Sequence, residues 1–149
     1  MSSGALAHRA RSLARRLALQ ALYQIQMNPL TWQEVQSQYA KDPEAERVDL
    51  AYFNALIEGT VPHREAFDLR LSGLCEIAPA DLDPIEHAVL WLGLHELDAH
   101  PELPYRVALA EAVQLAKQFG ATDGYKFVNA VLDRAARESR PQEYGQPVR

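Results

Sequence analysis

The sequence predicts an all-α fold, and two observations support that prediction. No stretch sustains the alternation of apolar and polar residues that a half-buried strand requires. Several windows instead repeat apolar residues at intervals of three and four, which is the spacing of one helix face. A chain of 149 residues can bury most of its apolar surface without disulfides or metal, so one domain is the default expectation.

The first predicted helix runs from about residue 7 to residue 27 and has a basic face. Its apolar residues form one stripe centred near Leu17, and Asn28-Pro29 ends the helix. The arginines fall on the opposite side of the helical wheel, so we expect all of them to face solvent. They are Arg9, Arg11, Arg15 and Arg16.

The next two helices are predicted from their caps. Thr31, with Glu34 three residues later, is a capping-box pattern for a short second helix that ends near Ala40. Asp42-Pro43 is expected to open a third helix that runs to Ile57 and is ended by Gly59.

A fourth helix is predicted to begin at residues 60–62, and residues 75–83 form the connection to the second half. Asp83 as N-cap and Pro84 as the first helical residue start the fifth helix. Residues 88–94 of that helix are apolar on every face, so we expect it to be surrounded by other helices as the central core element.

Two more helices complete the predicted fold. The sixth covers residues 105–119, and its polar positions form one narrow stripe. The seventh, capped by Thr122 or Asp123, continues to about residue 138. Residues 140–149 are predicted to be a frayed tail.

Charge is distributed unevenly along the chain. The net charge is -5, which by itself disfavours a polyanionic ligand, because binding to phosphates requires compensating cations. Residues 1–33 nevertheless contain four arginines and no acidic residue, so the remaining 116 residues hold 11 basic and 20 acidic side chains. This asymmetry is typical of a polyanion contact at one end of a protein, although a solvated basic helix would give the same pattern.

Two further features bear on the compartment. Cys75 is the single cysteine, so it forms no disulfide within the chain and suits a reducing environment. The first 30 residues lack the apolar core of a signal peptide, and no run approaches the roughly 18 apolar residues that a membrane span needs. We therefore expect a cytoplasmic protein that does not contact the membrane.

Catalytic and metal-binding motifs are missing from the sequence. Histidines near its middle can suggest zinc, yet His95 and His100 are five residues apart and point in different directions from one helix. Asp81 and Asp83 precede a helix start, so we interpret Asp83 as a cap. The seven glycines do not cluster into a phosphate-binding loop. We predict no catalytic residue, no cofactor and no metal.

The candidate nucleic-acid residues are the four arginines and Tyr23. A guanidinium offers planar, forked donors that match phosphate oxygens, and Tyr23 can stack on an unpaired base. An aromatic residue at helical spacing is more often part of a core, and the same alternative holds for Phe127 beside Lys126. These patterns alone leave RNA binding and a purely structural role open.

Several motifs resemble the NusB family. The longest match extends from Tyr105 to Asp133 and contains the strings YRVA, EAV, LAK, FGA and KFVNAVLD. Further matches are ALQALY in the first helix, Tyr52-Phe53 in the helix ending at Gly59, and IEHAVL in the fifth helix. Together they cover roughly residues 9–138, in order.

This resemblance implies a seven-helix NusB-type fold that forms one RNA-binding domain over residues 1–149. Its two packed helical halves are expected at about 7–74 and 81–138. Members of the family are bacterial transcription antitermination factors that bind the boxA element of nascent ribosomal RNA together with the small-subunit ribosomal protein NusE. That pair joins a complex with RNA polymerase and other Nus factors, so the resemblance implies a binding protein and not an enzyme.

The resemblance also implies site residues. The arginine-rich start of the first helix contacts RNA in the family, which matches Arg11 and Arg15, with Tyr23 and residues 123–127 on the same surface. Glu86 matches a position that meets the basic ribosomal protein, which the acidic surplus of the chain would attract. The full set of predicted RNA-binding residues is Arg9, Arg11, Arg15, Arg16, Tyr23, Asp123, Lys126 and Phe127.

Three positions depart from the family pattern. Ser12 and Leu13 stand where other members can have further arginines, which predicts a smaller electrostatic share of RNA binding. Ala130 stands where the family usually has glycine. Alanine is more favourable than glycine in a helix interior by about 1 kcal/mol, so we interpret Ala130 as a structural residue.

Two alternatives stay open at this point. NusB-like domains also form the RNA-binding front of an rRNA cytosine methyltransferase, but that enzyme needs a further α/β domain with a glycine-rich cofactor loop, which we do not expect here. A helical adaptor that binds only proteins would use the same fold, with its arginines merely solvated. The salt dependence of RNA binding separates the adaptor from the RNA-binding factor.

Overall fold

A computed structural model describes residues 2–145 and confirms the all-α prediction. Over these residues the chain forms seven α-helices and three short 3-10 helices, and it forms no strand. None of the described helices has the length and apolar character needed to cross a membrane. The chain divides into two compact units, residues 1–62 and 63–149, which are described separately below.

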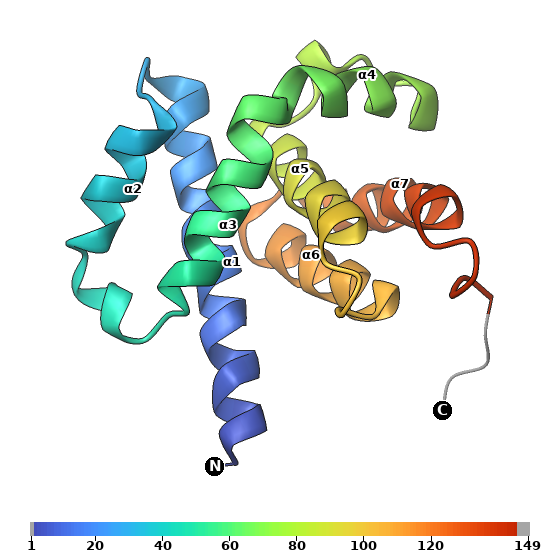
Figure 1. Cartoon of the computed structure of the whole chain (residues 1–149). Helices are drawn as coiled ribbons and strands as arrows, with labels where there is room; N and C mark the ends of the chain where they lie inside the picture. The colour runs from blue at the N-terminus through green and yellow to red at the C-terminus, as the bar shows by residue number, and fades with distance from the viewer. Residues whose placement is uncertain (1, 146–149) are drawn as a thin grey trace. The chain divides into compact units, whose positions relative to one another are not determined.

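Unit 1 contains three α-helices, α1 (Ser3–Met27), α2 (Trp32–Ala40) and α3 (Leu50–Thr60), with the 3-10 helix η1 (Pro43–Glu46) before α3. Helices α1 and α3 run alongside each other, and α2 contacts both (Figure 1). All three helices contribute apolar side chains to the core of the unit. Among them are Leu17, Leu22, Val35, Phe53 and Leu56.

Capping side chains explain where the first two helices begin. The hydroxyl of Ser2 accepts a hydrogen bond from the Ala5 N–H, so α1 starts earlier than predicted. The capping box of α2 is confirmed. Thr31 accepts from the N–H of Glu34, and the Glu34 carboxylate accepts from the N–H of Thr31, each at 3.1 Å.

The connection before α3 differs from the prediction. Asp42 and Pro43 open η1, and the Asp42 carboxylate accepts from the Glu44 N–H at 2.8 Å. A second cap, Asp49, starts α3, which then continues through Gly59 instead of ending there. Because two capping aspartates divide the segment, the chain forms two short elements where the sequence pattern predicted one helix.

Unit 2 contains α4 (Arg64–Leu74), α5 (Pro84–Ala99), α6 (Tyr105–Phe119) and α7 (Gly124–Ser139). The last three pack against one another, and α4 contacts both α5 and α7 (Figure 1). Helix α4, which the sequence prediction placed in the first half, therefore groups with the second unit. The prediction that the fifth helix is a central core element is confirmed, since residues 88–97 are all buried.

Helices α5 and α7 approach closely at Gly93. A Cβ atom at this position would lie 2.5 Å from Leu132 Cδ1, closer than a real Cβ atom can approach, so the absence of a side chain permits the contact. Ala130, by contrast, is exposed on α7. Its methyl group therefore does not obstruct the packing of α7 against another helix. This agrees with a structural role that depends on helix propensity alone.

The chain after α7 is held in place, contrary to the predicted frayed tail. Arg140 is buried, and its guanidinium donates to the carbonyl oxygens of Leu97, Leu103 and His100 at 2.8–2.9 Å. These bonds attach the segment after α7 to the end of α5 and the following loop. Residues 146–149 of the predicted tail lie outside the described residues.

Candidate nucleic-acid interface

One side of α1 stays exposed along most of the helix. Arg9, Arg16 and Tyr23 follow one another at intervals of seven residues, so they lie within about 40° of one another around the helix axis. Gln20 and Met27 lie in the same sector, and all five side chains are exposed. We call these five residues the α1 strip. Tyr23 is 41% exposed, so its ring is available for stacking and is not a core aromatic.

A different side of α1 places two arginines against an aromatic ring. The guanidinium of Arg11 lies 4.5 Å from the ring centroid of Tyr52 on α3, and its Nε is 3.9 Å from the Asp49 carboxylate. Arg15 is 2% exposed, and its guanidinium lies 5.4 Å from the same ring. The prediction that all four arginines face solvent is therefore wrong for Arg15, because Tyr52 provides a π-face for the cation within unit 1.

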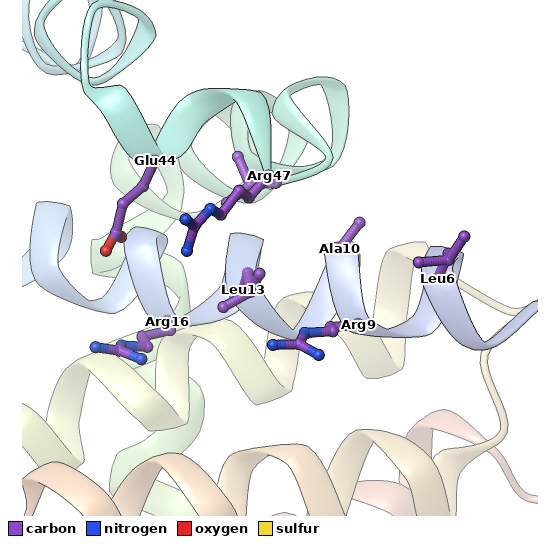
Figure 2. Close-up of a pocket in the computed structure, with 8 residues that line it drawn as sticks. Leu6, Arg9, Ala10, Leu13, Arg16, Glu44 and Arg47 are labelled. Atoms are coloured by element: carbon purple, nitrogen blue, oxygen red, sulfur yellow. The ribbon is translucent and has the colours of Figure 1, made fainter. Parts of the chain in front are cut away.

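A pocket of about 480 Å³ opens beside the N-terminal half of α1. Figure 2 shows Arg9 and Arg16 on α1 and, from the segment around η1, the side chains of Glu44 and Arg47 reaching toward the helix. Leu13 lies between the two groups in this view (Figure 2). The apolar part of the lining consists of Leu6, Ala10, Leu13 and Val48.

Sequence reasoning missed Glu44 and Arg47 as candidate site residues. Both follow Asp42-Pro43 in a short charged string that the sequence pattern assigned to the start of the third helix. Their place beside α1 depends on a tertiary contact, the hydrogen bond from the Asp49 N–H to the Ala10 carbonyl at 3.1 Å. This bond links the connection after η1 to α1, and no local sequence pattern predicts it.

The start of α7 carries the remaining predicted RNA-binding residues. Asp123 has a left-handed backbone with φ of 66°, which aspartate tolerates better than most residues. The Lys126 ammonium lies 3.4 Å from the Asp123 carboxylate, and both side chains are exposed. Phe127 is half-buried and lines an open groove together with Ile77 and Arg134. Unit 2 thus brings Asp123 and Lys126 together, whereas Phe127 faces a neighbouring groove.

Glu86, which was expected on an acidic face toward a protein partner, is only 8% exposed. Its carboxylate lies beside the start of α7, where Oε2 accepts from the Ala121 N–H at 3.4 Å. A Cβ atom at Gly124 would fall 2.6 Å from this carboxylate, so the loop before α7 fits tightly around it. Burial raises the pKa of Glu86 above its ordinary value. In this arrangement Glu86 positions the loop that carries Asp123, and its contact with a partner stays a prediction.

Three histidines of unit 2, His87, His95 and His100, have partners within the protein. His87 Nε2 lies 2.6 Å from Asp68 Oδ1, which also accepts from Trp91 Nε1 at 2.9 Å. His95 is buried, its Nε2 lies 3.0 Å from His100 Nε2, and burial lowers the pKa of His95 to about 4. Among the described residues, no group of three or more His, Cys, Asp or Glu side chains is arranged to hold a metal ion.

The fold and the interface together define a small all-α protein of the binding type, with a first helix that has a core face and an exposed cationic and aromatic strip. The sequence profile of the NusB family matches residues 12–137. The chain therefore belongs to the NusB family, as its motifs predicted. It is 42% identical to the transcription antitermination protein NusB of Methylobacillus flagellatus over 93% of this chain and 90% of that protein. It is 44% identical to the protein of that name from Pseudomonas putida, over 87% and 78% of the two chains.

Solved structures confirm the NusB-type fold. The structure of T. maritima NusB matches with a TM-score of 0.78 and 24% identity, over 91% of this chain and 97% of that one. A complex of the antitermination factors NusB and NusE with dsRNA contains a chain that matches with a TM-score of 0.76 and 23% identity, over 87% and 98%. At these identities the likeness concerns the fold.

Proposed function

We propose that this chain is a transcription antitermination factor that binds boxA-type single-stranded RNA of nascent ribosomal transcripts together with the small-subunit ribosomal protein NusE. The observation that carries the proposal is the α1 strip in a member of the NusB family. Relatives at 42–44% identity are named transcription antitermination proteins. Such a function is exercised by binding, so we assign no catalytic step and no cofactor.

The RNA side of the proposal rests on the chemistry of α1. Arg9 and Arg16 present exposed guanidinium groups whose forked donors match phosphate oxygens, and Tyr23 presents an open ring in the same sector. Arg11 is half-exposed and adds a third cation, which lies over the ring of Tyr52. Arg15 is assigned a supporting role beneath them, because a side chain with 2% exposure has little surface to offer RNA.

The start of α7 is proposed as a further RNA-binding element, within unit 2. Lys126 supplies an exposed ammonium that lies 3.4 Å from the Asp123 carboxylate. Phe127 would contribute through the part of its ring that faces the groove with Ile77. Glu86 supports this part indirectly by holding the loop before α7.

A basic ribosomal protein is the proposed partner because most of the chain is acidic. Exposed carboxylates precede α5 at Glu76, Asp81 and Asp83, and such a cluster attracts a basic surface at long range. One solved relative forms a complex with NusE and dsRNA. We further propose that the assembled pair joins RNA polymerase and other Nus factors in the cytoplasm, where nascent transcripts are made.

A titration of fluorescent boxA RNA, with and without the ribosomal protein, tests the proposal. We expect weak binding by the chain alone and tighter binding with the partner. The logarithm of the binding constant should fall with the logarithm of salt concentration with a slope of roughly -2, because about 0.7 counterions are released for each of three exposed arginines. A salt slope near zero, with the ribosomal protein still bound, would instead identify a protein-binding adaptor.

A further inference from the structure

The pocket beside α1 combines charged side chains with an aliphatic lining, a combination that no single predicted motif contained. Its wall on α1 carries Arg9 and Arg16, and its wall near η1 carries Arg47 and Glu44. Leu13 lies between them in Figure 2, and the aliphatic part of the lining also includes Leu6 and Val48. The charged residues lining the pocket therefore comprise three guanidinium groups and one carboxylate around an apolar floor.

This combination matches one nucleotide in size and in chemistry. A volume of about 480 Å³ is large enough for a base with its sugar and phosphate. The guanidinium forks suit phosphate oxygens, and the aliphatic floor suits the flat face of an unpaired base. Arg47, which lies outside the arginine-rich helix, would provide a third phosphate contact from across the pocket.

Glu44 favours a nucleotide over an acidic peptide as the ligand of this pocket, because a base offers hydrogen-bond donors to the carboxylate. A carboxylate only accepts hydrogen bonds at neutral pH, so it would repel an acidic peptide inside the pocket. The Watson–Crick edge of guanine offers two adjacent donors, the N1–H and the N2 amino group, which can meet both carboxylate oxygens. Uracil offers a single N–H between two carbonyl groups that the carboxylate would repel.

We infer that this pocket binds one guanine nucleotide of the single-stranded RNA, with Arg47 on its phosphate and Glu44 on its Watson–Crick edge. The inference rests on the proposed RNA-binding function and adds to it a residue that determines base preference. It also extends the interface from the α1 strip to the segment that follows η1.

The phosphate contact is tested with Arg47→Ala in the full chain, measured together with the ribosomal protein. The probe is a U-rich 12-mer RNA that carries one central guanosine. We expect about a fivefold loss of affinity and a salt slope that is smaller in magnitude by about 0.7, the value for one phosphate contact on a single strand. The matched control is Lys41→Ala, which removes an exposed cation of unit 1 that lies beside Gln38, outside this pocket. Equal effects of the two variants would overturn the inference.

The base contact is tested by changing the central nucleotide of the same 12-mer to inosine, adenosine or uridine. Inosine lacks only the N2 amino group, so we expect it to bind several-fold more weakly than guanosine, and uridine more weakly still. Glu44→Gln should bind the four RNAs with nearly equal affinity. If the wild-type protein binds all four RNAs equally, the inference fails while RNA binding stands. If it binds none of them and also fails to bind boxA RNA, the proposed function itself fails.

Discussion

Helices α1 and α5 are each the main core helix of their unit, yet they divide their surfaces differently. Helix α5 is buried on every side from residue 88 to residue 97, including the polar side chains of His95 and Glu96. Helix α1 is buried on most sides between Ala14 and Ile25, but one sector with Arg16 and Tyr23 stays exposed.

This difference indicates in which helix RNA binding can be changed without changing the stability of the fold. In α1 the exposed sector and the core stripe lie on different sides, so a substitution in one need not disturb the other. In α5 no such free sector exists over residues 88–97, and each substitution there changes the core. The following predictions test this contrast, beginning with the largest expected effect.

Acid should destabilise unit 2 through α5. Burial, together with the neighbouring His100, lowers the pKa of His95 to about 4, whereas the unfolded chain takes up this proton near pH 6.5. Between these values the unfolded state binds more protons, so the free energy of unfolding falls as the pH falls. The loss should reach about 3 kcal/mol at pH 4. Urea unfolding from pH 7 to pH 4 measures it, and His95→Gln should flatten the dependence. An equally steep dependence in that variant would assign the acid sensitivity to other groups.

Two neighbouring arginines of α1 should respond differently to truncation. Arg15→Ala removes a buried cation from the ring of Tyr52 and should lower the free energy of unfolding by about 2 kcal/mol. Arg16→Ala changes an exposed side chain and should stay within about 0.5 kcal/mol of the wild type. Chemical denaturation of both variants provides the comparison. Equal stabilities would mean that Arg15 has no greater structural role than Arg16.

RNA affinity should depend on the exposed arginines. The double variant Arg9→Ala with Arg16→Ala should bind boxA-type RNA about tenfold more weakly, or about 1.4 kcal/mol. Its salt slope should be smaller in magnitude by about 1.4, because two phosphate contacts are lost. Fluorescence anisotropy at several salt concentrations measures both quantities, with Lys41→Ala as the control. An unchanged slope would show that the α1 strip does not contact phosphates.

Tyr23 should contribute the smallest of these effects, and it should do so through its ring. Tyr23→Ala is expected to weaken RNA binding by about 1 kcal/mol, the lower end of the range for base stacking on an aromatic side chain. Tyr23→Phe keeps the ring and should bind almost as well as the wild type. If the phenylalanine variant is as weak as the alanine variant, the hydroxyl group and not stacking is responsible.

Periodicity and caps were sufficient to predict most of the fold. The capping box at Thr31 and the run of apolar residues in the fifth helix were located correctly because each is a local signal. The third helix was misplaced because Asp42 and Asp49 both have capping potential, and only the structure shows that both are used. Arg140 was assigned to a frayed tail because its carbonyl partners lie about 40 residues away in sequence.

The candidate site was predicted less completely than the fold. A helical wheel separates polar from apolar faces, but it cannot show that an aromatic ring from α3 covers Arg15. It likewise gave no reason to connect Arg47 with Arg9, because their proximity depends on how η1 is fastened to α1. Tyr23 was a candidate with two interpretations, and its exposure now favours the functional one.

The seven-residue spacing of Arg9, Arg16 and Tyr23 fixes the distances between these three side chains along α1. An α-helix rises about 1.5 Å per residue, so the three side chains mark a straight line of about 21 Å. Inserting one residue between them would turn everything beyond it by about 100° and would rotate the core stripe away from α3 at the same time. The spacing of contacts along the RNA is therefore tied to the folding of unit 1. RNA recognition can change through substitution of these three side chains or of residues in the loop after η1. It cannot change through insertions that alter the length of α1.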